Sequence, residues 1–197
     1  MLNPEMNDKE IQLPKSYSSI QGASNEINFS MPSDLQTGNL LRTLVASKPN
    51  GQFLELGTGT GLSLAWIVEA MNAKSHVYSI DNSEIYLSIA KDHFGSDKRV
   101  TLICQDGSTW IKENQDKKFD LIFADAWPGK YETLDEALDM LHIGGIYLID
   151  DMLPQENWPD GHQENVTKLL KYLESRSDFK ITKMNWSTGI VVSIKTK

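Results

Sequence analysis

The sequence has a single cysteine and lacks any long hydrophobic run. Because Cys104 has no second cysteine to pair with, an internal disulfide is excluded, which fits a reducing cytoplasm. Cys104 ends an apolar run, residues 100–104, so a packed thiol is expected rather than a nucleophile. No apolar stretch approaches the ~20 residues of a transmembrane helix, and the polar, acidic residues 1–10 are unlike a secretory signal. We therefore expect a cytoplasmic protein with no membrane association.

Positive charge is also scarce. The chain has 19 Lys and Arg against 27 Asp and Glu, a formal net charge of −8. Nucleic-acid binding draws much of its affinity from Lys and Arg on phosphates, so a nucleic-acid partner is disfavoured. The total still leaves room for a local basic patch, such as a tRNA enzyme would carry.

The length of 197 residues fits one domain preceded by a short arm. Residues 1–28 are rich in Asn, Ser, Gln and Glu and contain two prolines, which predicts a flexible N-terminal arm. Residues 29–197 are then a single domain. The arm and the first helix after it could serve as a lid or as the contact of a homodimer, and the sequence leaves both open.

From residue 53 onward, predicted strands and helices alternate. Such alternation predicts an α/β fold with a Rossmann-like, doubly wound sheet. The last two strands have no helix between them, so this seven-stranded sheet should be mostly parallel with an antiparallel C-terminal hairpin strand. Strands are expected at 53–56, 77–80, 100–104, 119–124, 146–149, 179–184 and 190–194, and helices at 34–48, 62–71, 83–94, shortly after 107, 134–141 and 163–175.

The most informative motif is residues 53–61, Phe-Leu-Glu-Leu-Gly-Thr-Gly-Thr-Gly. An apolar strand ends in a loop with glycine at every second position, and an apolar helix follows. Glycine permits unusual backbone angles and lets a ligand approach the backbone closely. The start of the helix offers unpaired N–H groups and partial positive charge. This layout is typical of a nucleotide-type cofactor site.

Two details identify the cofactor. A dinucleotide fingerprint, G-x-G-x-x-G, would need glycine at position 62, where Leu62 stands. Glu55, two residues before Gly57, would repel a pyrophosphate and suits a cationic ligand. S-adenosylmethionine (SAM) has an ammonium, a sulfonium and no phosphate. The segment resembles the E/D-x-G-x-G-x-G motif of the class I SAM-dependent methyltransferases, whose sheet also has seven strands; a nicotinamide dehydrogenase is disfavoured.

The resemblance implies a set of cofactor contacts. Ser63, in the first helical turn, would hold the SAM carboxylate, and Asp81, which ends the second strand, would accept both ribose hydroxyls. Asn82 would lie against the adenosine, and Asp106 with Gly107 would recognise the adenine amine. Helix caps and a simple turn remain the alternatives for Ser63, Asp81 and Asp106. The full expected set is Glu55, Gly57, Thr58, Gly59, Gly61, Ser63, Asp81, Asn82, Asp106, Gly107 and Asp125. Residues 28–32 would lie over the cofactor.

Residues 121–131 and 148–152 resemble the strand-four and strand-five motifs of the catechol and caffeoyl-CoA O-methyltransferases. The resemblance implies that Asp125, Asp150 and Asp151 hold a divalent metal, Mg²⁺ or another hard cation. Asp151 departs from the family, which has Asn there. Pro128 stands where the catechol enzymes carry a lysine base, and Lys130 follows two residues later.

Four residues are candidates for the catalytic step: Asp125, Asp151, Lys130 and His162. Lys130 is either a base or a solvated loop lysine, and His162 either a base or a surface residue that opens the next helix. The chemistry expected is attack of a substrate oxygen on the methyl carbon of SAM, with any metal lowering the pKa of the hydroxyl.

The sequence thus predicts a SAM-dependent O-methyltransferase that acts on a hydroxyl of a small molecule, either with the help of a divalent metal or, without one, with Asp150 or Asp151 as general base. A tRNA methyltransferase of the same fold and a SAM-binding protein without catalysis remain alternatives. The acceptor pocket is built from loops, so the sequence does not name the acceptor.

Overall fold

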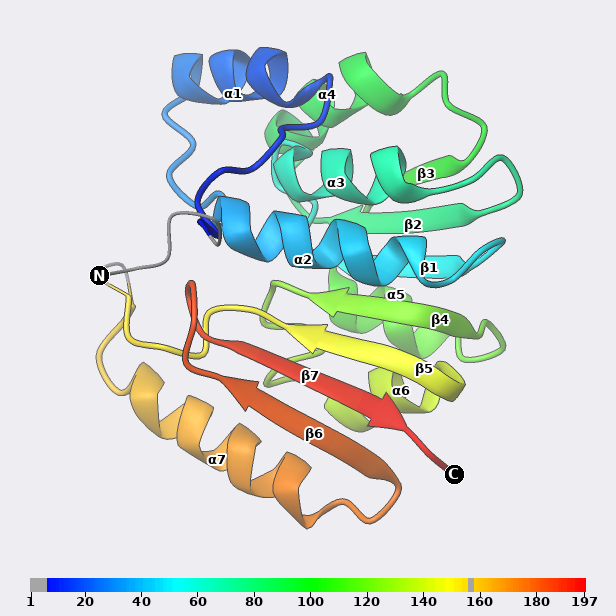
Figure 1. The fold of residues 1–197 in the computed structure, drawn as a ribbon, viewed down its shortest axis with the longest axis vertical. Coiled ribbons are helices and arrows are strands. Elements are labelled where there is room, and N and C mark those ends of the chain that lie inside the picture. The colour runs from blue at the N-terminus through cyan, green and yellow to red at the C-terminus, as the bar shows by residue number, and fades with distance from the viewer. Residues whose placement is uncertain (1–6, 156–157) are drawn as a thin grey trace.

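The computed structural model describes residues 7–155 and 158–197 and has a seven-stranded sheet between two layers of helices (Figure 1). The strands are β1 (Gln52–Leu56), β2 (His76–Asp81), β3 (Val100–Cys104), β4 (Phe119–Ala124), β5 (Leu141–Ile149), β6 (Phe179–Met184) and β7 (Ile190–Lys195). The helices are α1 (Tyr17–Glu26), α2 (Leu35–Ala46), α3 (Leu62–Ala70), α4 (Glu84–Phe94), α5 (Gly107–Glu113), α6 (Leu134–Asp139) and α7 (His162–Ser175). Within these described ranges no helix is both long and apolar enough to cross a membrane.

The strand order is β3-β2-β1-β4-β5-β7-β6. Strands β1 to β5 pair in parallel, whereas β7 is antiparallel to both β5 and β6. The order reverses between β1 and β4, and in open α/β sheets ligands bind outside the carboxyl ends of the strands at such a point. The predicted fold class, including the antiparallel hairpin strand, is confirmed.

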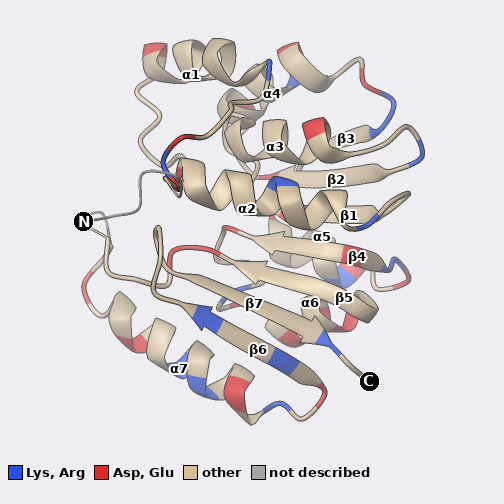
Figure 2. Cartoon of the chain, in the orientation of Figure 1, with Lys and Arg blue, Asp and Glu red and all other residues tan. Residues whose placement is uncertain are grey.

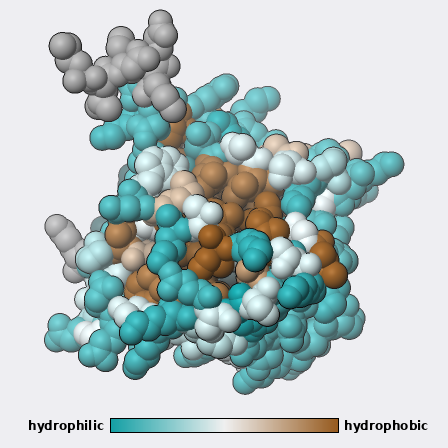
Figure 3. Space-filling view, turned by 60° about the horizontal axis from the view of Figure 1, so that its bottom comes forward, coloured by the Kyte–Doolittle hydropathy of each residue, from teal (hydrophilic) through white to brown (hydrophobic). Residues whose placement is uncertain are grey.

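The helices divide between the two faces of the sheet, and each face has its own apolar core. Helices α1 to α4 cover one face, with Trp66, Leu41 and Phe53 fully or almost fully buried in that core. Helices α5 to α7 cover the other face, around Trp110, Tyr147 and Leu173. Figure 3 shows hydrophobic residues reaching the surface in a hollow ringed by hydrophilic ones. Burial of both faces accounts for the near-continuous apolar runs of the parallel strands.

Polar residues begin several of the helices, as their positions in the sequence predict. The carboxylate of Asp34 accepts the N–H of Gln36 before α2, and the hydroxyl of Ser83 accepts the N–H of Tyr86 before α4. These bonds satisfy N–H groups that have no partner within the helix.

The structure differs from the sequence prediction at the N-terminal arm. Residues 17–26 form α1, whose Tyr17 and Ile20 are buried against the domain. Ser24 Oγ lies 2.8 Å from Thr60 Oγ1 in the glycine-rich loop. The segment is polar in composition, but Tyr17 and Ile20 are three positions apart and lie on one face of the helix, which is enough for that face to pack against the domain. Residues 1–6 of the predicted arm lie outside the described residues.

Two further expectations are corrected. Strand β5 begins at Leu141, because Leu141 pairs with Phe119 before the register shifts, so the predicted helix ends at Asp139 rather than at 141. Cys104 is exposed rather than packed, since it is the last residue of β3 at the edge of the sheet.

The charges are unevenly placed. Figure 2 shows acidic residues in the loops after β4 and β5 and basic residues along β6, whereas α7 carries charges of both signs. The carboxyl ends of the central strands are therefore a negative rim, which favours a cationic ligand over a phosphate.

Candidate active site

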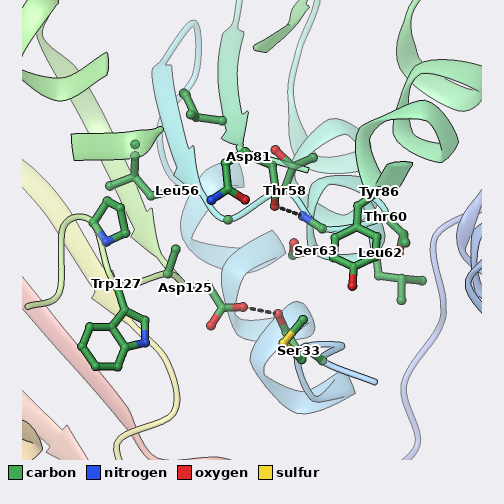
Figure 4. A pocket seen from close by; sticks show the side chains of 18 of the residues that line it. Ser33, Leu56, Thr58, Thr60, Leu62, Ser63, Asp81, Tyr86, Asp125 and Trp127 are labelled. Atoms are coloured by element: carbon green, nitrogen blue, oxygen red, sulfur yellow. Dashed lines mark hydrogen bonds between the residues drawn. The ribbon is translucent and has the colours of Figure 1, made fainter. Parts of the chain in front are cut away.

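A cavity of ≈ 490 Å³ lies at the carboxyl ends of the central strands, beside the point where the strand order reverses (Figure 4). Pockets of ~300–1,000 Å³ hold drug-sized ligands. Its lining comes from the loops after β1, β2, β3 and β4 and from the segment before α2. The residues are Phe29, Met31, Pro32, Ser33, Leu56, Gly57, Thr58, Gly59, Thr60, Leu62, Ser63, Ile80, Asp81, Asn82, Tyr86, Asp106, Gly107, Asp125, Ala126, Trp127, Pro128 and Glu132.

The glycine-rich loop forms the floor of the cavity. Gly57 has a φ of 101°, and a Cβ on it would lie 2.8 Å from the carbonyl oxygen of Asp125. Gly61, with a φ of 97°, is the N-cap of α3. Other residues would strain the backbone at both positions, so the loop can pass under the neighbouring strand end only with glycine. The first N–H groups of α3 are thereby presented at the cavity.

Asp81 joins the glycine-rich loop to the end of β2. Its Oδ2 accepts the N–H of Gly59 at 2.8 Å, and its Oδ1 accepts the N–H of Ser83 at 2.8 Å. A carboxylate has about four lone-pair sites, so both oxygens can accept further donors from a ligand. Asp81 therefore holds the loop in place and lines the cavity, as a ribose-binding acid would.

Glu55 differs from its expected place. Glu55 is fully buried beneath the loop, and it is not among the described residues that line the cavity. The hydroxyl of Ser79 donates to Glu55 Oε2, and Thr58 Oγ1 lies 2.6 Å from Ser79 Oγ. Burial raises the pKa of Glu55 to about 8. Its place under the loop supports an indirect role, through the backbone of the loop, rather than a direct contact with a ligand.

Most of the other predicted cofactor residues do line the cavity, namely Thr58, Gly59, Ser63, Asn82, Asp106 and Gly107, whereas Gly61 is not among the described lining residues. Asp106 also caps α5, because its Oδ1 accepts both the N–H of Thr109 at 2.8 Å and the Thr109 hydroxyl at 2.9 Å. These bonds lower the pKa of Asp106. A Cβ on Gly107 would lie 2.8 Å from Cβ of Pro128, so the two loops touch there. Direct contact of these residues with a cofactor stays a prediction.

Asp125, at the end of β4, lies between two donors. The hydroxyl of Ser33 donates to Oδ2 at 2.8 Å, and the Lys130 Nζ lies 3.7 Å from Oδ1 (Figure 4 shows the Ser33 bond). Lys130 is only 6% exposed, so it is not a solvated loop lysine. Burial raises the pKa of Asp125, and the Lys130 ammonium opposes that rise.

Asp150 and Asp151 follow β5 and differ in burial. Asp150 is fully buried, and its Oδ1 accepts the Asp151 N–H at 2.8 Å and the hydroxyls of Thr188 and Thr37. Its Oδ2 is buried without a hydrogen-bond partner among the described residues. Burial, followed by the charges of Asp125 and Asp151, raises the pKa of Asp150. Asp151 is half-buried with a φ of 57°.

The expected metal ligands do not form a metal centre. Within residues 7–155 and 158–197, no three or more His, Cys, Asp or Glu side chains are grouped so that they could hold a metal ion. A hard cation needs several oxygens converging on it. Here Ser33 and Lys130 flank Asp125, and three donors share one oxygen of Asp150. In this arrangement the three acids do not form such a cage, which argues against a divalent metal.

His162, the first residue of α7, lies in an aromatic cluster rather than on the surface. It is 8% exposed, its Nε2 lies 3.1 Å from the Tyr131 hydroxyl, and its ring centroid is 4.5 Å from that of Trp158. Nδ1 is buried without a partner in the described part of the chain. Burial and then the charge of Lys130 lower the pKa of His162. Neither His162, Lys130, Asp150 nor Asp151 is among the described residues that line the cavity.

Sequence reasoning missed several residues of the site. From the sequence Ser33 is only a candidate cap for the helix that follows, yet its hydroxyl donates to Asp125. Tyr86 of α4 lines the cavity and packs edge-on against Phe29, with ring centroids 4.9 Å apart. Thr37 and Thr188 bind Asp150 from two distant segments. No local pattern marks such residues, since only the fold brings them together. The segment 28–32, expected over the cofactor, does contribute Phe29, Met31 and Pro32 to the cavity.

Known proteins resemble this chain in sequence. Residues 54–152, about half of the chain, match a protein-family model described as a methyltransferase domain. The O-methyltransferase hkm8 of Aspergillus hancockii is 35% identical over 127 residues, which cover 61% of this chain and 50% of that protein. The chain spans about half the length of the curated relatives it matches.

Solved structures share the whole fold. The O-methyltransferase TomG of Streptomyces achromogenes, described in complex with SAM, superposes with a TM-score of 0.80 at 20% identity, covering 96% of this chain and 93% of that one. An O-methyltransferase of Bacillus cereus, in complex with S-adenosylhomocysteine (SAH), has a TM-score of 0.81 at 17% identity, with 96% and 94% covered. At such identities the likeness concerns the fold.

Proposed function

The chain belongs to a family of methyltransferase domains, and we propose that it is an O-methyltransferase that moves the methyl group of SAM to a hydroxyl of a small molecule. The observation that supports this most is the cavity that joins the glycine-rich loop and Asp81 at one end to Asp125 and Trp127 at the other. One end suits an adenosine with its ribose, and the other leaves an acid and an exposed aromatic ring for an acceptor.

The charges of the cavity suit a cationic cofactor. Four acids line it: Asp81, Asp106, Asp125 and Glu132. SAM carries an ammonium and a sulfonium, and both are attracted to a negative, partly desolvated cavity. Its carboxylate is the exception, and the N–H groups at the start of α3 provide a place for it. The proposed orientation directs the sulfonium methyl towards Asp125.

The reaction is a displacement at the methyl carbon. The acceptor oxygen attacks that carbon, a C–O bond forms while the C–S bond breaks, and the sulfonium becomes the neutral thioether of SAH. The hydroxyl proton passes to a carboxylate or to water. Of the proposed catalytic residues, Asp125 is the one that lines the cavity, so we assign it the hydrogen bond that orients the acceptor hydroxyl. Trp127, 48% exposed, offers a wall for the acceptor.

The experiment is transfer of labelled methyl from SAM to a panel of small hydroxylated acceptors, with total tRNA as a separate arm. We expect label on a hydroxyl and a loss of about 10²-fold or more in kcat/KM in Asp125→Asn. The exposed Asp116→Asn is the matched control. Label in tRNA alone, or SAH binding without transfer to any acceptor, would contradict the proposal.

A further inference from the structure

Asp125, Asp150 and Asp151, which the resemblance assigns to a metal, lie at the same end of the sheet as the buried side chain of Lys130. Lys130 is 6% exposed, and its Nζ lies 3.7 Å from Oδ1 of Asp125. A buried ammonium needs an acid close by, because burial without a partner disfavours its charged form. The ion pair therefore accounts for the burial of both groups.

The backbone fixes where this ammonium can lie. The turn after β4 is closed by hydrogen bonds from the N–H groups of Lys130 and Tyr131 to the carbonyl of Trp127, at 3.1 and 2.9 Å. The Tyr147 hydroxyl donates to the carbonyl of Gly129 at 2.7 Å. Gly129 has a φ of 83°, and a Cβ there would lie 2.5 Å from Leu56 Cδ1. The stem of Lys130 thus leaves a rigid turn and extends towards Asp125.

Donors engage one oxygen of Asp125 and one of Asp150, and the other oxygen of Asp125 faces the Lys130 ammonium. Ser33 donates to Oδ2 of Asp125, on the side away from Lys130. The hydroxyls of Thr37 and Thr188 and the N–H of Asp151 all engage Oδ1 of Asp150. A divalent ion bound to Asp125 would also stand beside the ammonium and repel it. The acids at this end of the sheet are therefore balanced by the ammonium of Lys130.

We infer that the Lys130 ammonium takes the electrostatic place of the divalent metal ion that the resemblance to the catechol and caffeoyl-CoA O-methyltransferases implies, so that this protein binds its cofactor and transfers the methyl group without a metal. This rests on the proposed function. Lys130 is a positioning residue: it holds the Asp125 carboxylate at the cavity, while Asp125 contacts the acceptor.

The test is calorimetric titration of MgCl₂, and separately MnCl₂, into protein saturated with SAH. The SAH step tests the proposed function, and the metal step tests the inference, so failure of one is distinguishable from failure of the other. Wild type should bind neither metal at millimolar concentration, and its SAH affinity should be equal in EDTA and in MgCl₂.

Two variants test whether Lys130 is the reason that wild type does not bind a metal. Lys130→Gln removes the charge and leaves the acids unbalanced, so metal affinity should rise about tenfold or more. Lys130→Arg keeps the charge and should behave as wild type. Thermal unfolding shows whether each variant folds, and the EDTA comparison on wild type needs no variant. Metal binding by wild type that strengthens SAH binding would overturn the inference, as would folded Lys130→Gln without any gain in metal binding.

Discussion

At the scale of single residues, the site is an arrangement of acids whose neighbours differ. Asp81 binds backbone N–H groups, Asp125 binds a hydroxyl and faces an ammonium, and Glu55 is buried under the loop. The sequence predicts that acids stand at the strand ends, because the carboxyl ends of parallel strands share one edge. It does not predict their partners. The choice for Lys130 between a base and a solvated residue depended on a turn that only the fold shows.

Asp81→Ala is predicted to weaken SAH binding by about 10- to 100-fold. The change removes the expected ribose contact and also the acceptor that holds the Gly59 N–H, and hydrogen bonds to a charged group contribute ~1.5–3 kcal/mol each. Calorimetric titration measures the effect. Asp92→Ala, an exposed acid on α4, is the control and should bind SAH as wild type does. Unchanged affinity in folded Asp81→Ala would contradict the assignment of this residue.

Glu55 predicts a pH dependence of stability. Its pKa is about 8 in the folded protein against an ordinary value of 4.5, so the folded state holds the proton more tightly than the unfolded state. The free energy of unfolding should therefore fall as pH rises from about 4.5 to 8, by at most ~1.4 kcal/mol per pH unit from this group. Glu55→Gln cannot titrate, so it should gain stability relative to wild type across that window.

Urea unfolding without cofactor, at several values between about pH 5 and 8, measures the difference in free energy of unfolding between wild type and Glu55→Gln. Asp125 and Asp150 are present in both proteins, so the comparison isolates Glu55. The exposed Glu26→Gln is the control and should follow wild type at every pH. A constant difference between wild type and Glu55→Gln would show that the carboxyl stays charged when buried.

At the scale of elements, the strands and most helices were predictable and the N-terminal helix was not. Strand β4 has its predicted bounds, and helix α3 begins at the predicted Leu62, because apolar periodicity and glycine breaks are local signals. Helix α1 has polar composition, and its place depends on packing against α3 and α4, which are distant in the sequence. Propensity alone does not reveal such docking.

Ile20→Ala tests whether α1 is part of the folded domain. Ile20 is fully buried, so truncation should lower the free energy of unfolding by about 2–5 kcal/mol. Ser18→Ala, exposed on the same helix, should change it by less than about 0.5 kcal/mol. Urea unfolding gives both values. Equal stability of Ile20→Ala and wild type would indicate an arm that does not dock in solution.

At the scale of the whole molecule, the strand order reversal, the glycine-rich loop and the acidic rim meet at one cavity. Fold class and family followed from the alternation of strands and helices and from the glycine motif, and both are confirmed. Among the described residues, no three or more His, Cys, Asp or Glu side chains are grouped so that they could hold a metal ion. The metal centre stays a prediction, because it depends on how three side chains converge rather than on their order in the chain. The acceptor depends on loops around Trp127, for which the sequence has no code.

The most direct test of the account is a calorimetric titration of the wild-type protein with SAH, with NADH titrated in parallel. The account predicts saturable binding of one SAH per chain and no binding of NADH, because the cavity is acidic and its loop lacks the third dinucleotide glycine. Absence of SAH binding by folded protein, or binding of NADH in its place, would contradict it.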